Sequence, residues 1–146
     1  MKISLYGLKQ IELREGVIYR VYKDSRGLLT GGCGHLLSPN ERRAYPYNTG
    51  LSKQTVDNWL ENDLQKCFNA ISDLVKVPLA QNEFDALCSF IFNIGVHGFA
   101  SSSTLRELNK GNYKMAGLKM MLWNIPHEII GRRKQESVQF LTPYKI

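Results

Sequence analysis

Residues 15–35 read EGVIYRVYKDSRGLLTGGCGH, and this stretch decides how the rest of the chain is interpreted. Two β-prone runs, residues 17–23 and 28–34, flank the turn-like segment DSRG at residues 24–27. The second run is rich in glycine, which indicates bends or the close approach of another backbone or a ligand. We therefore expect residues 17–37 to form a small β-meander.

Two carboxylates and a hydroxyl lie in or beside this meander. Asp24 follows Glu15 by 9 positions, and Thr30 follows Asp24 by 6. Two carboxylates in different settings, with a hydroxyl near one of them, suit acid–base hydrolysis of a glycosidic bond. Each residue also has an ordinary explanation, because Glu15 could be an exposed helix-end residue and Asp24 a common turn residue.

The composition describes an ordinary globular chain. It has 146 residues, the length of one domain, with 43% apolar and 22% charged residues. The net charge of +6 favours polyanionic partners, which include nucleic acid, anionic membranes and the acidic polymers of a bacterial wall.

Three cysteines are present, and none forms a CxxC pair, so neither a disulfide framework nor a metal site is indicated. We expect free thiols in a reducing cytosol. Cys33 lies two positions before His35, which leaves a catalytic thiol as an alternative. No oxyanion loop or orienting group supports that alternative.

The first 16 residues are punctuated by charges and contain no long apolar run. We expect no signal peptide and no membrane span. The protein is then made and kept in a cytoplasm, and any action outside the cell requires a separate means of release.

Apolar periodicity predicts that the rest of the chain is mainly helical. The predicted helices are about 8–14, a long helix from about 55 to 76, then 81–94, 104–110, 112–125 and 130–141. We expect residues 38–50 to be a surface connection and residues 97–105 to be a turn with a helix cap. In the last helix, Val138 and Leu141 are expected to face inward.

The motif Glu15-x8-Asp24-x5-Thr30, followed by Gly32-x-Gly34-His35 and a helical lobe, resembles the phage-type lysozymes. These are the endolysins of glycoside hydrolase family 24, the family of the T-even phage lysozymes. Residues that match the family are Glu15, Gly16, Tyr22, Asp24, Gly27, Thr30, Gly32, Gly34, His35, Leu36, residues 77–95, Phe99, Leu105, residues 108–113, Trp123, Arg132, Arg133 and Glu136.

The resemblance implies an α+β, lysozyme-like fold for a single domain over residues 1–146. A β-rich lobe at about 15–50 would be joined by the long helix to a larger helical lobe at about 52–146, which includes the helix at 8–14. A cleft would lie between the lobes. Gly31 departs from the family, whose members usually carry an apolar residue there, so we expect a looser strand at residues 31–34.

The resemblance also assigns roles to residues. Glu15 would be the general acid, and Asp24 with Thr30 would activate a water in an inverting reaction, with the carboxyl groups about 6.5–9.5 Å apart. Arg132 would orient Glu15, and His35 would form a structural pair with Asp63. Leu36, Phe92 and Asn93 are the candidates that line the substrate cleft. Asn93 would donate to a sugar N-acetyl or hydroxyl group, or would simply cap its helix.

The implied function is a muramidase that cleaves the β-1,4 bond between N-acetylmuramic acid and N-acetylglucosamine in peptidoglycan. It would act as a monomer without cofactor or metal. It would be held in the host bacterial cytoplasm and released through a holin-type pore to lyse the cell. The alternatives are a lytic transglycosylase, against which Asp24 and Thr30 argue, and a non-catalytic basic module that binds cell wall or nucleic acid. No nucleic-acid-binding motif supports the last of these.

Overall fold

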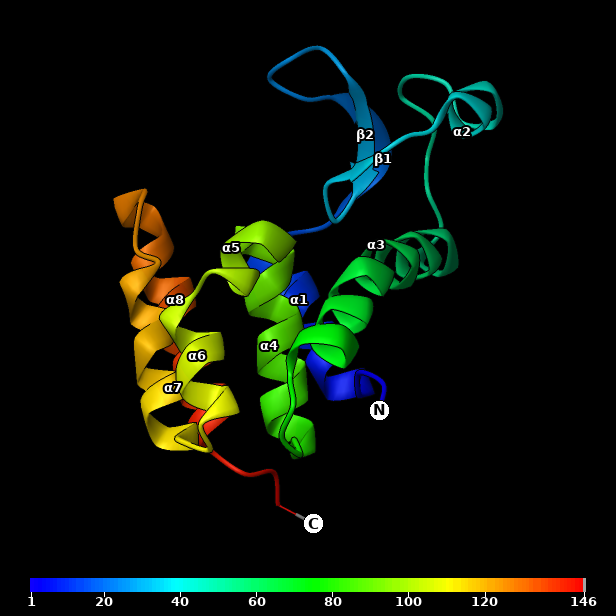
Figure 1. The fold of residues 1–146 in the computed structure, drawn as a ribbon. Coiled ribbons are helices and arrows are strands. Elements are labelled where there is room, and N and C mark those ends of the chain that lie inside the picture. Colours follow the sequence, from blue (N-terminus) through cyan, green and yellow to red (C-terminus); the bar gives the residue numbers. More distant parts are fainter. Residues whose placement is uncertain (146) are drawn as a thin grey trace. The chain divides into compact units, whose positions relative to one another are not determined.

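Three short strands form one antiparallel sheet in the order β1-β2-β3 (Figure 1). They are β1 (Ile18–Lys23), β2 (Leu29–Gly32) and β3 (His35–Leu36). The structure is a computed structural model that describes residues 1–145. The predicted β-meander is confirmed.

The chain groups into two compact units, which are described separately here. One contains residues 11–65, and the other combines residues 1–10 with the chain from Lys66 to the end of the described region. The helices are α1 (Leu5–Glu15), α2 (Pro39–Ala44), α3 (Lys53–Leu74), α4 (Gln81–Ile94), α5 (Val96–Ala100), α6 (Ser103–Asn109), α7 (Tyr113–Lys119) and α8 (Ile130–Leu141). Short 3-10 turns lie at η1 (Met120–Leu122) and η2 (His127–Ile129).

The register of the sheet places three predicted or matched residues in one row. Tyr22 on β1 pairs with Thr30 on β2, and Thr30 pairs with Leu36 on β3. Directly opposite residues of an antiparallel pair extend from the same face of a sheet. Thr30 is therefore flanked on its own face by Tyr22 and Leu36.

Gly31 lies in a tightly packed part of this sheet, and the strand ends at Gly32, so the looser strand expected over residues 31–34 stays a prediction. Gly31 is buried and pairs with His35. A Cβ atom at this position would meet Leu51 Cδ1 at 2.7 Å and the Trp59 ring at 3.3 Å. Leu51 and Trp59 thus occupy the space that an apolar side chain at position 31 would fill.

Residues 38–50 were expected to be a connection, but they contain helix α2. Ser38 caps it, because its hydroxyl accepts from Glu41 N at 3.2 Å while Glu41 Oε1 accepts from Ser38 N at 2.8 Å. Pro39 occupies the first helical position. The sequence Ser-Pro-Asn-Glu carries this capping box together with a first-turn proline, two signals that predict a helix start.

Helix α4 is the centre of the second unit. All residues from 84 to 91 are buried, so every side of this segment of the helix faces protein. Helix α8 packs along α4, and Figure 1 shows α7 and α6 on the same side. Residues 96–100 form the short helix α5 instead of the expected turn, and the helix expected at 112–125 ends in η1.

The inward face of α8 is polar, so the expectation for Val138 and Leu141 is wrong. Val138 is 56% exposed and Leu141 is 37% exposed. The buried stripe is Arg133, Glu136, Ser137 and Phe140, which has helical spacing. Apolar periodicity missed it because a charged pair occupies the core positions.

Buried Asp85 fixes the start of α1 to α4. It accepts hydrogen bonds from Ser4 N at 3.1 Å, from the Ser4 hydroxyl and from Gln81 Nε2 at 2.8 Å. Tyr144 near the other end of the chain donates to the same carboxylate at 2.9 Å. Four donors satisfy a carboxylate that would be costly to bury alone.

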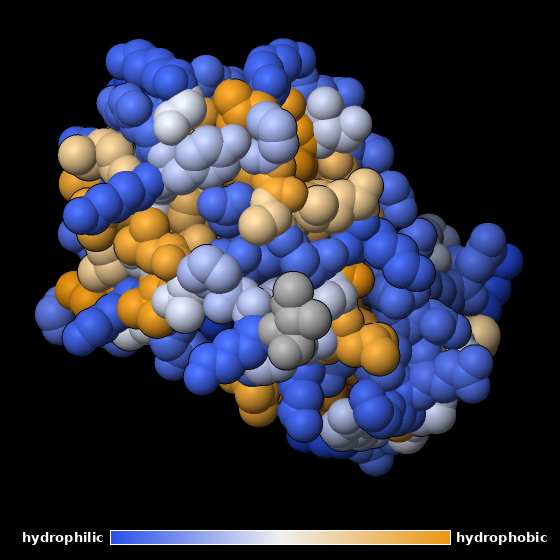
Figure 2. All heavy atoms as spheres, turned by 90° about the horizontal axis from the view of Figure 1, so that it is seen from below, coloured by the Kyte–Doolittle hydropathy of each residue, from blue (hydrophilic) through white to orange (hydrophobic). Residues whose placement is uncertain are grey.

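On the face drawn in Figure 2, hydrophilic side chains cover most of the surface, and apolar side chains gather in separate patches. None of the helices within residues 1–145 combines the length and the apolar character that a membrane crossing requires.

The packing around Gly31 gives a first prediction. Gly31→Ala should lower the free energy of unfolding by about 1–3 kcal/mol, because the new methyl overpacks against Leu51 and Trp59. Urea unfolding measures this. Gly50→Ala is the matched control, since a Cβ atom at Gly50 meets nothing within 4 Å.

The same packing predicts that Leu51→Ala costs less in the Gly31→Ala background than in the wild type. The two costs in free energy of unfolding are expected to differ by at least about 0.5 kcal/mol, because truncating Leu51 opens space for the new methyl group at position 31. Additive effects, or a Gly31→Ala protein as stable as Gly50→Ala, would contradict the packing argument.

Candidate functional site

Glu15 is the last residue of α1. The helix ends because Gly16 adopts a positive φ of 78°, with Gly16 N donating to Glu12 O at 2.9 Å. The helix therefore ends one residue after the predicted end at about residue 14. The Glu15 side chain is partly buried.

Asp24 is held by the backbone of its own turn. Its Oδ1 accepts from Arg26 N at 2.8 Å and from Leu28 N at 2.9 Å, and its Oδ2 faces the Arg26 guanidinium at 3.2 Å. The Leu28 N–H lowers the pKa of Asp24 most, and together with the contacts of Arg26 it outweighs desolvation, which raises this pKa. The carboxylate is therefore kept ionised and fixed in one orientation.

Thr30 has a fixed hydroxyl close to the same turn. The side chain is buried, and Oγ1 donates to Leu28 O at 3.0 Å. Because the hydroxyl proton is committed to this carbonyl, the lone pairs of Oγ1 remain as acceptors. Leu28 thus links the two residues, since its N–H binds Asp24 and its carbonyl binds Thr30.

His35 lies between two carboxylates. Its Nδ1 is 2.8 Å from Asp63 Oδ2, the predicted contact, and its Nε2 is 2.8 Å from Glu41 Oε1. The ring stacks on Trp59 with centroids 4.6 Å apart. Ionised carboxylates only accept, so His35 makes both hydrogen bonds to ionised partners when both ring nitrogens carry protons and the imidazole is a cation. Both nitrogens are occupied, which supports the predicted structural role.

The titration of this cluster follows from its contacts. Burial lowers the pKa of His35, but the hydrogen bonds to Asp63 and Glu41 outweigh it and raise the pKa above its ordinary value. Burial raises the pKa of Glu41, but the Ser38 N–H and His35 outweigh it and lower that pKa.

Cys33 does not have the features of a nucleophile. It is buried, and desolvation, followed by the nearby carboxylates Glu12 and Glu15, raises the pKa of its thiol to about 12. A reactive cysteine requires a thiolate and a base, whereas His35 has both nitrogens engaged. The alternative of a catalytic thiol is therefore unsupported.

Arg132 is anchored within the helical unit. Its Nε donates to Glu136 Oε2 at 3.0 Å, and its terminal nitrogen donates to Ser89 O at 2.9 Å. Ser89 Oγ donates to the same Glu136 oxygen at 2.5 Å. These contacts fix the direction of the guanidinium, while its predicted action on Glu15 stays a prediction.

The predicted substrate-binding residues lie on two elements. Leu36 is 49% exposed on β3 beside Thr30. Phe92 is partly buried and Asn93 exposed in the last turn of α4, where Asn93 Oδ1 accepts from the Arg133 guanidinium. The structure thus brings Leu36 to Thr30, and it ties Asn93 to Arg133.

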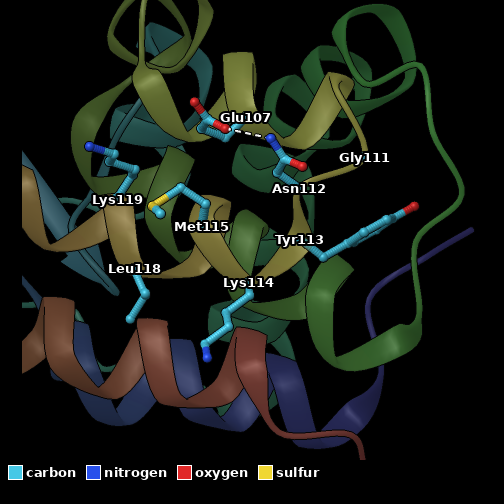
Figure 3. A pocket seen from close by; sticks show the side chains of 8 residues that line it. All are labelled: Glu107, Gly111, Asn112, Tyr113, Lys114, Met115, Leu118 and Lys119. Carbon is cyan, nitrogen blue, oxygen red and sulfur yellow. Dashed lines mark hydrogen bonds between the residues drawn. The ribbon is translucent and has the colours of Figure 1, made fainter.

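An open pocket of about 900 Å³ lies between α6 and α7 (Figure 3). Its lining combines apolar Met115 and Leu118 with Lys114 and Lys119. Asn112 donates to Glu107 at 2.9 Å across its rim. None of the residues predicted for catalysis lines this pocket.

Sequence reasoning missed several residues that support the site. Glu41 is the second partner of His35, and the capping box at Ser38 was the signal that could have placed it on a helix. Ser89 and Glu136 hold Arg132, and no local pattern identifies a buried serine as a partner of a residue 43 positions away. Arg26, two positions after Asp24 in the same turn, contacts the Asp24 carboxylate with its guanidinium.

The profile of the phage lysozyme family matches residues 12–136. The chain is 39% identical over 146 aligned residues to the endolysin of Salmonella phage P22, covering 97% of this chain and 99% of that protein.

Solved structures agree with the sequence matches. A crystal structure of a P22 lysozyme point mutant superposes with a TM-score of 0.88 at 38% identity, covering 97% of this chain and 99% of that one. The muramidase domain of SpmX from Asticaccaulis excentricus gives a TM-score of 0.85 at 32% identity, with the same coverage.

The His35 cluster predicts a pH dependence of stability. The contribution of His35 is full below its unfolded pKa of about 6.5 and is lost as pH rises through its raised folded pKa. The contribution of Glu41 is present above about 4.3 and is lost as pH falls through its lowered folded pKa. Both contributions are complete between roughly pH 4.5 and 6.5.

Asp63→Asn should therefore flatten the loss of stability between about pH 6 and pH 9, and should lower stability most at about pH 5.5. Thermal unfolding across this range measures it. Asp73→Asn, an exposed position on the same helix, is the control. An unchanged pH profile in Asp63→Asn would refute the cationic pair, and a fully folded but inactive His35→Ala would refute its structural role.

Proposed function

The chain belongs to the phage lysozyme family, and we propose that it cleaves the β-1,4 bond between N-acetylmuramic acid and N-acetylglucosamine in peptidoglycan by an inverting mechanism. Glu15 protonates the leaving oxygen, and Asp24 with Thr30 activates the attacking water. The observation that carries this proposal is the pair of fixed acceptors at Asp24 and Thr30.

The setting of Asp24 suits a general base and disfavours an acid. Two backbone N–H groups and Arg26 stabilise the ionised form. Oδ1 already accepts twice, whereas Oδ2 has one protein contact and retains acceptor capacity. That oxygen can take a proton from water without giving up the turn.

Thr30 supplies the second acceptor for the same water. A water that donates one proton to Asp24 Oδ2 and the other to Thr30 Oγ1 has its oxygen lone pairs directed away from both. This is the orientation that an attack on an anomeric carbon requires. A hydroxyl that was free to rotate could instead donate to the water and turn it.

An anionic cell-wall polymer as substrate is consistent with the positive net charge of the chain and with the names of its relatives. The net charge of +6 favours association with a polyanion. The relatives named above are called endolysin and lysozyme, and one structural neighbour is called a muramidase domain. We extend the proposal to a monomer that reaches the wall through a holin-type pore. Lysis of an expressing bacterium only when a pore is co-expressed would support that extension.

Purified peptidoglycan strands test the mechanism. Wild-type enzyme should release products with new reducing ends whose first anomer, followed by proton NMR, is α, because inversion acts on a β bond. Glu15→Gln should lower the rate by roughly 10²–10⁴-fold, since it removes the proton donor. Thr30→Val should lower the maximal rate while Thr30→Ser retains most of it.

Glu61→Gln, an exposed carboxylate on α3, is the control for loss of a negative charge. Thermal unfolding of each variant shows whether a lost rate reflects lost structure. A first product in the β form would exclude inversion. Anhydro ends would point to a lytic transglycosylase, and tight nucleic-acid binding without turnover would point to a basic binding module.

A further inference from the structure

Arg133 is a fully buried residue whose guanidinium donates hydrogen bonds to groups on different sides of it. Nε donates to Trp123 O at 2.9 Å, one terminal nitrogen donates to Glu136 Oε1, and the other donates to Asn93 Oδ1. The guanidinium also lies 5.3 Å from the centre of the Phe90 ring. The side chain is therefore fixed in position and in plane.

The anchor of this arrangement is itself buried. Glu136 is 0% exposed and binds Arg133 through one oxygen. Its other oxygen accepts from Arg132 Nε and from Ser89 Oγ. Buried charges that are paired and hydrogen-bonded on every side resist rearrangement, because any rotation leaves a charged group without its partner.

This arrangement decides which end of the Asn93 amide is offered to solvent. An asparagine can present either its oxygen or its NH₂ group, but a guanidinium has only donors. The Asn93 atom that faces Arg133 must therefore be Oδ1, and the NH₂ group is directed away from it. Flipping the amide would set two donors against each other.

We propose that Arg133 is a positioning residue that makes Asn93 a fixed hydrogen-bond donor to a carbonyl oxygen of the substrate. This inference rests on the proposed function. A fixed donor needs an acceptor, and a carbonyl oxygen always offers one, whereas a sugar hydroxyl can also turn its own proton toward the amide. Peptidoglycan offers two kinds, the N-acetyl carbonyl and the carbonyls of the lactyl group with its attached peptide.

Asn93→Asp separates positioning from structure. The carboxylate still accepts from Arg133, so thermal stability should be equal to or higher than that of the wild type. The donor is lost, so KM on soluble peptidoglycan strands should rise roughly tenfold with kcat changed by less than about twofold. Asn58→Asp, an exposed position on α3, controls for the added negative charge and should change neither constant.

Two substrates distinguish the source of the carbonyl. On glycan strands from which an amidase has removed the peptides, the KM effect of Asn93→Asp persists if the N-acetyl group is the acceptor. On these strands the lactyl carbonyl has become a carboxylate, so the KM effect grows if that group is the acceptor, because the introduced carboxylate then repels it. The effect disappears if the acceptor is a carbonyl within the removed peptide.

The side-chain amide of Asn93 gives a direct readout. In ¹⁵N-labelled Glu15→Gln protein, the NH₂ signals that are missing in the Asn93→Asp spectrum should shift when peptidoglycan strands are added. Unshifted signals, or an Asn93→Asp enzyme with wild-type KM, would overturn the inference while leaving the proposed function intact. A wild-type protein that releases no reducing ends would instead overturn the proposed function.

Discussion

A single imidazolium cation ties together three elements of the unit that carries the motif. His35 on β3 binds Asp63 on α3 and Glu41 on α2, and its ring lies against Trp59. Glu41 at the same time closes the capping box that starts α2. Because β3 pairs with β2, this cluster also anchors the strand that carries Thr30. The histidine thus helps to hold the strand that carries Thr30, and both of its ring nitrogens are engaged in doing so.

The unit that contains residues 1–10 and the chain from Lys66 onward has a similar cluster around a buried ion, with the charges reversed. There a single carboxylate, Glu136, is buried between Arg132 and Arg133. In both units the central ion is buried, and each of its polar atoms has a partner of opposite charge or a hydrogen bond. Removing one partner from such a group leaves a buried charge uncompensated, which costs more than the pair contributes when intact. Each cluster therefore acts mainly by fixing the positions of its side chains, and adds less to the free energy of unfolding.

The sequence predicted the elements that depend on local patterns. The meander and the helix at Ile130–Leu141 are present in the structure. The His35–Asp63 contact, which the resemblance implied, is also present. The prediction from sequence failed where buried positions carry charged or polar side chains, or where the packing partners are distant in sequence. The inner face of α8 is charged, so apolar periodicity pointed to Val138, and the core volume near Gly31 comes from Leu51 and Trp59, which lie 20 or more positions away. The roles of Glu15, Asp24 and Thr30 remain predictions from the resemblance.

These networks determine whether a polar group at their edge can only donate or only accept a hydrogen bond. Backbone N–H groups hold Asp24 as an acceptor, and the Leu28 carbonyl commits the proton of Thr30, so this corner can only accept. Arg133 takes the oxygen of Asn93, so that residue can only donate. A water has two protons to give, and a substrate carbonyl has only lone pairs to offer. Under the proposed mechanism, each ligand can then bind in one orientation, and the wrong orientation sets like groups against each other. That penalty selects geometry without any additional attractive contact.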